Sequence, residues 1–120
     1  MDTPRQQVPK SSNSPESWSG ERVDEIMRLL APKRRQRIVA MLEERPRTID
    51  RHVLARALAA TESGMDIPGD NAVQRVEIDL HHNHLPALDE ADVLQYDPDR
   101  GTVRLGDDRR VRRLLATIKQ

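Results

Sequence analysis

The sequence predicts a mainly α-helical domain with one small β-hairpin. Apolar residues recur with helical spacing in several successive segments, which is typical of amphipathic helices. From Val73 to Leu105 this spacing passes directly into two short apolar runs around the turn DPDRG, which indicates a hairpin. A long helix that leads into a tight hairpin forms the second half of a winged helix-turn-helix, so we expect that fold.

The domain is expected to follow a short tail. The chain has 120 residues, which is enough for one domain with its own core. Residues 1–20 are rich in Pro and Ser and lack the apolar core of a signal peptide, so we expect a disordered N-terminal tail there. We assign residues 21–120 to one winged-helix domain with a C-terminal helix.

Composition narrows the class of protein. The chain has no cysteine, which excludes disulfides and thiolate metal sites, and no apolar run approaches the ~20 residues needed to cross a membrane. We therefore expect a cytoplasmic protein without membrane contact. Seventeen arginines and three lysines are balanced by 20 acidic residues to a net charge of zero. Trp18 and Tyr96 are the two aromatic residues, so stacking on single-stranded nucleic acid is not expected.

Each of the first three helices is predicted from its own apolar stripe. A leading helix ends before Pro32, which suits the first turn of the next helix, and that helix ends at Pro46. Thr48 or Asp50 caps the third helix, which ends at the loop ESGMDIPGDN. The stripes are Val23, Ile26, Met27 and Leu30 in the first helix, Ile38, Met41 and Leu42 in the second, and Val53, Leu54, Ala57 and Leu58 in the third.

The fourth helix, residues 71–85, is the expected recognition helix. Arg75, Asp79 and His82 lie opposite its apolar side on a helical wheel, so they face water or a partner. Pro86 lacks a backbone N–H and crowds the preceding turn, which predicts a kink or break between His82 and Pro86. The apolar side consists of Val73, Val76, Leu80, Ala87 and Leu88.

The rest of the chain is expected to turn, form the hairpin and end in a helix. The segment PALDEA is expected to be a second short turn that leads to Asp92 in a left-handed conformation. The two strands of the hairpin contain Val93, Leu94 and Tyr96 in the first and Thr102, Val103 and Leu105 in the second. The stripe of the terminal helix contains Val111, Leu114, Leu115 and Ile118.

The stretch LHHNHLPALDEADVLQYDPDRGTVRL resembles an uncharacterised winged-helix domain family of haloarchaea, in which the helix ends in H-x-H-L-P-x-L-D-E-A and runs into a strand and wing. APKRRQRIVAMLEE and TIDRHVLARALAA are similar to the first two helices of that family, so the resemblance spans about residues 22–106. More distantly, the stretch resembles the end of the recognition helix in metal-sensing and PadR-like repressors. The resemblance implies a transcription-regulator-like domain of unknown function. Asp92 stands where the family usually has Gly, and Ala87 where a basic residue is common.

The charge pattern places the candidate phosphate contacts on both sides of the recognition helix, because these contacts come from Lys or Arg. Residues 21–47 hold eight basic and five acidic groups and residues 100–120 hold seven and two, whereas residues 71–99 hold one and seven. Arg75 and Asp79 can neutralise each other at i, i+4. The candidate contacts to double-stranded DNA are Arg34, Arg35, Arg37, Arg100 and Arg104 for phosphates and Gln74, Arg75, His81, His82 and Asn83 for base edges.

Two functions remain open for this fold. One is a DNA-binding transcription regulator, and the other is a winged-helix protein–protein interaction module whose acidic helix repels DNA. In the first case the candidate arginines converge on the side that carries Arg75 and His82, and in the second case they scatter. The leading and C-terminal stripes each need an apolar partner, which favours a homodimer through these helices over docking on the same domain.

No cofactor, metal site or enzyme activity is expected. His81 and His84 share a helix face but leave a metal short of ligands, and His84 is expected to make a buried hydrogen bond to the backbone near Pro86. The sequence contains no Ser-His-Asp order in a strand-to-helix context, no glycine-rich phosphate loop and no carboxylate pair framed by a pocket.

Overall fold

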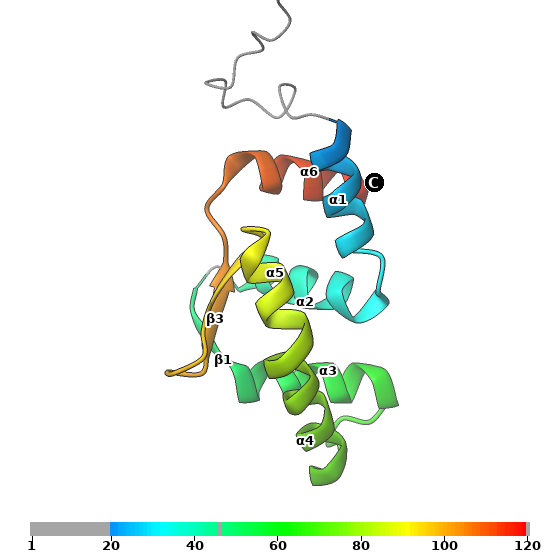
Figure 1. The fold of residues 1–120 in the computed structure, drawn as a ribbon. Helices are drawn as coiled ribbons and strands as arrows, with labels where there is room; N and C mark the ends of the chain where they lie inside the picture. The colour runs from blue at the N-terminus through cyan, green and yellow to red at the C-terminus, as the bar shows by residue number, and fades with distance from the viewer. Residues whose placement is uncertain (1–19, 46, 120) are drawn as a thin grey trace, which may run out of the picture.

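The computed structural model describes residues 20–45 and 47–119 as a mainly helical domain with a small sheet (Figure 1). The disordered tail expected over residues 1–20 lies outside the described residues except for Gly20, with which the first helix begins. The helical elements are α1 (Gly20–Leu29), α2 (Lys33–Glu44), α3 (Arg51–Ser63), α4 (Asp70–Asp79), the π-helical turn η3 (Leu80–His84), α5 (Leu85–Glu90) and α6 (Arg109–Lys119). The strands are β1 (Ile49–Asp50), β2 (Leu94–Asp97) and β3 (Thr102–Leu105).

The three strands form one antiparallel sheet in the order β1-β3-β2. The predicted hairpin is confirmed: β2 pairs with β3, with Leu94 opposite Leu105 and Tyr96 opposite Val103. The sequence did not predict β1, because two residues are too short to show the alternation that marks a strand. This short strand places Ile49 beside Val103 and so ties the start of α3 to the hairpin.

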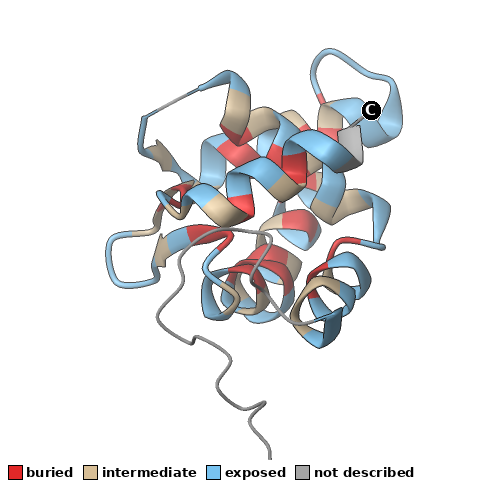
Figure 2. Cartoon of the chain, turned by 90° about the horizontal axis from the view of Figure 1, so that it is seen from above, coloured by how far each residue is buried: buried red, intermediate tan, exposed pale blue. Residues whose placement is uncertain are grey.

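The core is aliphatic and draws on every helix. Figure 2 shows the buried positions of the helices turned toward the interior between them. The largest side chains with almost no exposed surface are Ile26, Ile38, Leu42, Leu54, Leu58, Leu80, Leu85, Leu88, Val93, Leu94, Val103 and Val111. Each such side chain contributes about 1.5–3 kcal/mol of hydrophobic stabilisation. Because the sequence lacks Phe, a core of Leu, Ile, Val, Ala and Met is expected. The buried cluster of the described residues contains the first four types, and Met41 packs partly buried against it.

Two of the predicted stripe residues with described side chains are exposed. Val53 is 43% exposed and Met27 is 46% exposed. In α3 the buried face contains Leu54, Ala55, Leu58 and Ala59. The predicted stripe of α3 was wrong by about one position because α3 packs against both α2 and α4, and these contacts bury Ala55 and Ala59 as well.

A single wide turn, η3, replaces the predicted break in the fourth helix. The N–H of Leu85 donates to the carbonyl of Leu80, five residues back. Pro86 follows in the first turn of α5 and, having no N–H, donates no hydrogen bond to the preceding turn. A widened turn next to a proline satisfies the backbone without ending the helix. The prediction that PALDEA forms a turn was therefore wrong, because Leu85–Glu90 is helical.

The left-handed residue that follows the helix lies where the sequence predicts it. Asp92 has a φ of 65°, the left-handed conformation that we predicted for it. The N–H of Val93 then donates to the carbonyl of Leu88 at 3.0 Å, which satisfies one of the last carbonyls of α5. This reversal directs the chain from α5 into β2.

The leading and terminal helices lie at the same end of the molecule (Figure 1). In α6 Val111 is 1% exposed and Leu115 is 3% exposed, and both belong to the same buried cluster as Ile26 of α1. The side chain of Ile118 lies outside the described part of the chain. The apolar partner of these stripes is therefore supplied by the chain's own core, which removes the observation that favoured a homodimer.

Candidate nucleic-acid interface

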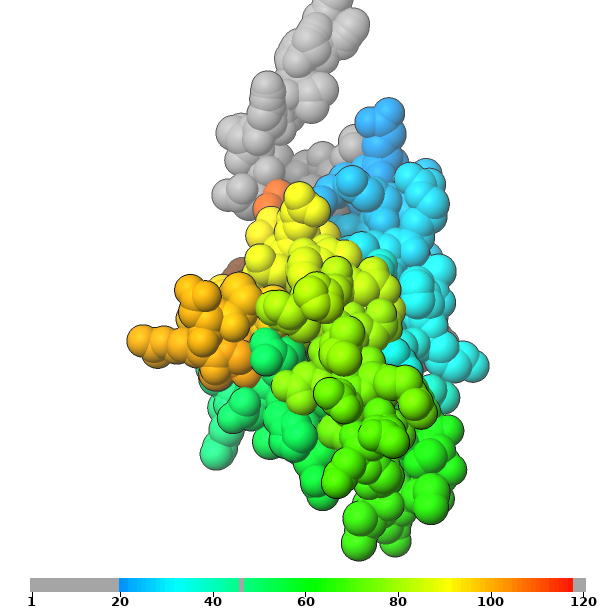
Figure 3. Space-filling view, turned by 60° about the horizontal axis from the view of Figure 1, so that its bottom comes forward, coloured from blue at the N-terminus to red at the C-terminus, as the bar shows by residue number. Residues whose placement is uncertain are grey.

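The outer face of α4 is an exposed helical surface that lies between α2 and the hairpin. Val73 and Val76 anchor the inner side of this helix in the core. Its outer side carries Gln74 and Arg75, which are exposed, and Ile78, which is 52% exposed. In Figure 3, α4 occupies the centre of the face, with the hairpin on one side and α2 on the other. The predicted recognition helix is thus open to a partner along its length.

The beginning of α2 is joined to α4 by Arg34. Its guanidinium donates to Glu62 at the end of α3, with an Nε–Oε2 distance of 2.6 Å, and to Asp79 at the end of α4, with an Nη1–Oδ2 distance of 2.7 Å. The hydrogen bond with Arg34 lowers the pKa of Glu62, and the nearby charge of Arg37 acts in the same direction. Arg34 therefore fastens three helices together and has part of its charge neutralised by the protein itself.

Asp79 also binds His84, the only polar side chain that is buried among the described residues. Nε2 of His84 lies 2.8 Å from Oδ2 of Asp79, and Nε of Arg35 donates to Nδ1 of His84 at 2.9 Å. Since Nδ1 accepts a hydrogen bond, the imidazole is neutral and carries its proton on Nε2. Burial lowers the pKa of His84, and the charge of Arg35 adds to that effect.

This contact changes two expectations. His84 binds side chains rather than the backbone near Pro86, because the wide turn η3 brings it back over Asp79. Asp79 is occupied by Arg34, His84 and Asn83, not by Arg75. Burial opposes the charge on Asp79, but these three neighbours outweigh it and keep the pKa of Asp79 below its usual value.

On the other side of α4, Tyr96 connects the hairpin to two helices. Its hydroxyl group lies 2.6 Å from Nδ1 of His81 in η3, and Nη1 of Arg51 in α3 donates to the same oxygen. Arg51 also donates to Glu77 of α4, and His52 contacts the second oxygen of that carboxylate at 2.9 Å. Hydrogen bonds from His52 and Arg51 lower the pKa of Glu77. Arg51 and Tyr96 were not among the predicted site residues, because their contacts join segments far apart in the chain.

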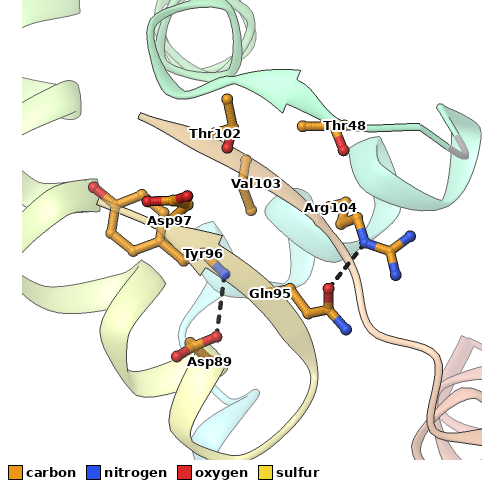
Figure 4. A pocket seen from close by; sticks show the side chains of 8 residues that line it. All are labelled: Thr48, Asp89, Gln95, Tyr96, Asp97, Thr102, Val103 and Arg104. Carbon is orange, nitrogen blue, oxygen red and sulfur yellow. Dashed lines mark hydrogen bonds between the residues drawn. The ribbon is translucent and has the colours of Figure 1, made fainter. Parts of the chain in front are cut away.

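The two hairpin arginines lie at different ends of the hairpin. The side chain of Arg100, in the turn, is 82% exposed and lies 3.9 Å from Asp97. Arg104 donates to Gln95 on the paired strand at 2.9 Å and to Asp107 at 2.7 Å, at the base of the hairpin next to α6. Figure 4 shows Arg104 and Gln95 among the residues that line a shallow cavity of about 170 Å³. Arg100 is therefore the hairpin arginine available to a partner at the tip.

The candidate residues are thus only partly brought together. Arg34 and Arg35 reach α4 and η3, where Asn83 accepts a hydrogen bond from Arg35 at 3.2 Å. Arg37 is half-buried on the same helix, α2. His81 is turned toward Tyr96, whereas His82 is exposed. The arginines neither all converge on one face nor scatter over the whole surface.

The described residues contain no group of three or more His, Cys, Asp or Glu side chains that could hold a metal ion. His81 and His84 bind different neighbours, Tyr96 and Asp79, on different sides of the helix. Within the same described ranges, every helix is too short or too polar to cross a lipid bilayer.

Comparison with known proteins identifies the family. Neither the curated proteins nor the solved structures give a match to the chain. The model of one family, described as a domain of unknown function (DUF7344), matches residues 27–104, which run from α1 to β3 and include α4 and η3. The sequence resemblance is therefore confirmed at the level of a domain of unknown function, while the haloarchaeal origin and the winged-helix nature of the family stay predictions. The chain belongs to the DUF7344 family.

Proposed function

We propose that this protein is a winged-helix DNA-binding module that acts in transcription regulation. The observation that carries the proposal is the order of the elements. A helix (α2), a short strand (β1), two packed helices (α3 and α4) and a hairpin (β2 and β3) follow one another, and β1 adds to the hairpin beside β3. This is the arrangement expected of a helix-turn-helix followed by a wing.

In this proposal the outer face of α4 enters the major groove of duplex DNA. An α-helix fits that groove, and Gln74 and Arg75 are side chains that pair with adenine and guanine edges, respectively. Arg100 at the hairpin tip and the basic start of α2 lie on opposite sides of α4 and would contact phosphates. Base contacts supply sequence preference, and phosphate contacts supply register and most of the nonspecific affinity.

A second candidate function, protein–protein interaction through the same face, is favoured by two observations. Ile78 is 52% exposed near the end of α4, and an exposed apolar side chain suits a protein partner. Arg34 and Arg35 are held by the protein's own acceptors, which reduces what they offer to phosphate. DNA binding is the primary proposal because the fold exposes both the outer face of α4 and Arg100 at the tip of the hairpin.

The test measures binding of the full chain to random-sequence duplex DNA by fluorescence anisotropy at several salt concentrations. Binding that weakens linearly in a plot of log affinity against log salt supports the proposal, because each phosphate contact contributes a slope of about 0.9. Absence of binding at the lowest salt, where phosphate contacts are strongest, overturns it and favours the protein partner.

A further inference from the structure

One of the hydrogen bonds that hold the basic start of α2 against η3 depends on the protonation state of a histidine. Arg35 donates through Nε to Nδ1 of His84, and this nitrogen can accept only while it carries no hydrogen. The other face of the same ring donates from Nε2 to Asp79. A buried imidazole thus stands between a cation from α2 and an anion from α4.

We infer that His84 is a proton-operated latch that holds Arg35 against η3 when neutral and releases the Arg35 side chain to solvent when protonated. Protonation places a hydrogen on Nδ1, directly opposite Nε–H of Arg35, so two donors and two positive charges meet where a hydrogen bond existed. The imidazolium keeps its bond to Asp79, because that contact becomes an ion pair. Protonation therefore breaks the contact of His84 with Arg35 and keeps the contact with Asp79.

The other charged groups around His84 decide which arginine moves. Asp79 from α4 is its one acidic neighbour, and Arg34 and Arg35 from α2 are its basic neighbours. Arg34 stays in place because Glu62 of α3 holds it through two further hydrogen bonds. Arg35 keeps only neutral acceptors, the carbonyl of Leu29 at 3.0 Å and the side-chain oxygen of Asn83 at 3.2 Å.

The latch operates on the acid side of neutrality. Burial lowers the pKa of His84 from its ordinary value, so the ring is neutral at pH 7 and gains its proton as the medium becomes acidic. If the chain binds DNA as proposed above, release of Arg35 beside α4 adds one phosphate contact. Acid then strengthens binding more in the unmodified chain than in a variant that lacks the His84 imidazole.

The first arm of the test uses nuclear magnetic resonance and is independent of DNA. The full chain is titrated from pH 7.5 to 4.5 while the nitrogen resonances of the His84 ring and the Arg35 Nε–H are followed. We expect the Nε2–H tautomer of His84 at pH 7.5 and loss of the protected Arg35 Nε–H signal with the same midpoint as protonation of His84. An Nδ1–H tautomer at pH 7.5, or an Arg35 signal that is unchanged through the titration, overturns the latch.

Two variants sharpen this arm. His84→Gln keeps an acceptor for Arg35 and a donor for Asp79 but cannot take up a proton, so the Arg35 signal is expected to persist at all pH values. His82→Gln removes an exposed imidazole on the same turn and is expected to behave like the unmodified protein. An equal loss of the Arg35 signal in His84→Gln overturns the proposal. If His84→Gln does not fold, the coincidence of midpoints in the unmodified protein decides.

The second arm measures the salt dependence of binding to random duplex DNA at pH 7.5 and at pH 5. In the unmodified chain the slope of log affinity against log salt steepens between pH 7.5 and pH 5 by about 0.9 more than in His84→Gln, the value for one added phosphate contact. An equal change in His84→Gln overturns the contribution of Arg35 to binding. No binding at either pH overturns the proposed function, whereas the resonance arm still decides the latch.

Discussion

The hydroxyl group of Tyr96 lies 2.6 Å from Nδ1 of His81, so the hairpin and the π-helical turn are joined by a single side-chain contact. The same oxygen accepts a hydrogen bond from Arg51 at the start of α3. The phenol of Tyr96, the only aromatic ring among the described residues apart from the histidines, therefore adds polar contacts to the β1–β3 pairing and the buried side chains that hold the hairpin in place. Removing that oxygen should loosen the hairpin without disturbing the apolar core.

Tyr96→Phe is expected to lower the free energy of unfolding by about 1–3 kcal/mol, because partly buried donors lose their acceptor. Urea unfolding followed by circular dichroism measures this change. A double-mutant cycle with His81→Ala is expected to show a coupling energy of about 0.5 kcal/mol or more, as for residues in contact. Strictly additive effects would mean that the contact contributes nothing to stability.

Neighbouring residues of α3 separate the observed core from the predicted stripe. Leu54 is 1% exposed and Val53 is 43% exposed. Leu54→Ala is expected to cost about 2–5 kcal/mol through lost burial and the cavity left behind. Val53→Ala is expected to change stability by less than about 0.5 kcal/mol, as for exposed positions. Chemical denaturation of both variants checks which face of α3 is buried. Equal losses of stability in the two variants would contradict the observed face.

Gly106 lies where the chain leaves β3, and a side chain there meets backbone. A Cβ atom would be 2.7 Å from the carbonyl oxygen of Asp92 and 3.1 Å from that of Val93. Gly106→Ala is therefore expected to cost about 1–3 kcal/mol, as overpacking does. Gly69→Ala is the matched control, because that position has open space and a φ of −68°. Thermal unfolding should show a lower midpoint only for the first variant.

Stability is expected to fall in two steps as the pH decreases. The pKa of His84 is lowered in the folded protein, so between its ordinary value of about 6.5 and that lower value the unfolded chain binds the proton first and folding becomes less favourable. The lowered pKa values of Asp79, Glu62 and Glu77 remove further stability below about pH 4.5. Urea unfolding at a series of pH values measures both steps.

His84→Gln is the variant that identifies the first step. With no group to titrate at that position, the variant should lose the first step and keep the fall in stability at the onset of carboxylate titration. A first step that persists unchanged in His84→Gln would assign it to another group.

Binding to duplex DNA is expected to weaken in Arg75→Ala and in Arg100→Ala, and the salt dependence of each variant should lose about one unit of slope if the arginine contacts a phosphate. A loss of sequence preference with little change in slope would instead place Arg75 on a base edge. Arg112→Ala, on the exposed side of α6, is the control and should bind like the unmodified protein. Equal weakening in all three variants would mean that binding is diffuse.

Much of the architecture could be predicted because it depends on local spacing. Each predicted helix and both hairpin strands are present in the described chain, and Asp92 adopts the left-handed conformation expected of it. Apolar residues at helical or alternating spacing segregate to one side of an element whatever they later pack against. The phase of α3 and the strand β1 were missed, since both depend on which neighbours the element meets.

The sequence by itself therefore determined the mainly helical class, the hairpin and the aliphatic core. Only the tertiary structure decided which side chains the charged residues contact. Arg34 meets Asp79, Arg35 meets His84 and Arg51 meets Tyr96, and these partners are 45, 49 and 45 residues apart in the chain. Periodicity shows which residues share a face, but an ion pair forms between faces that come together only when the helices pack.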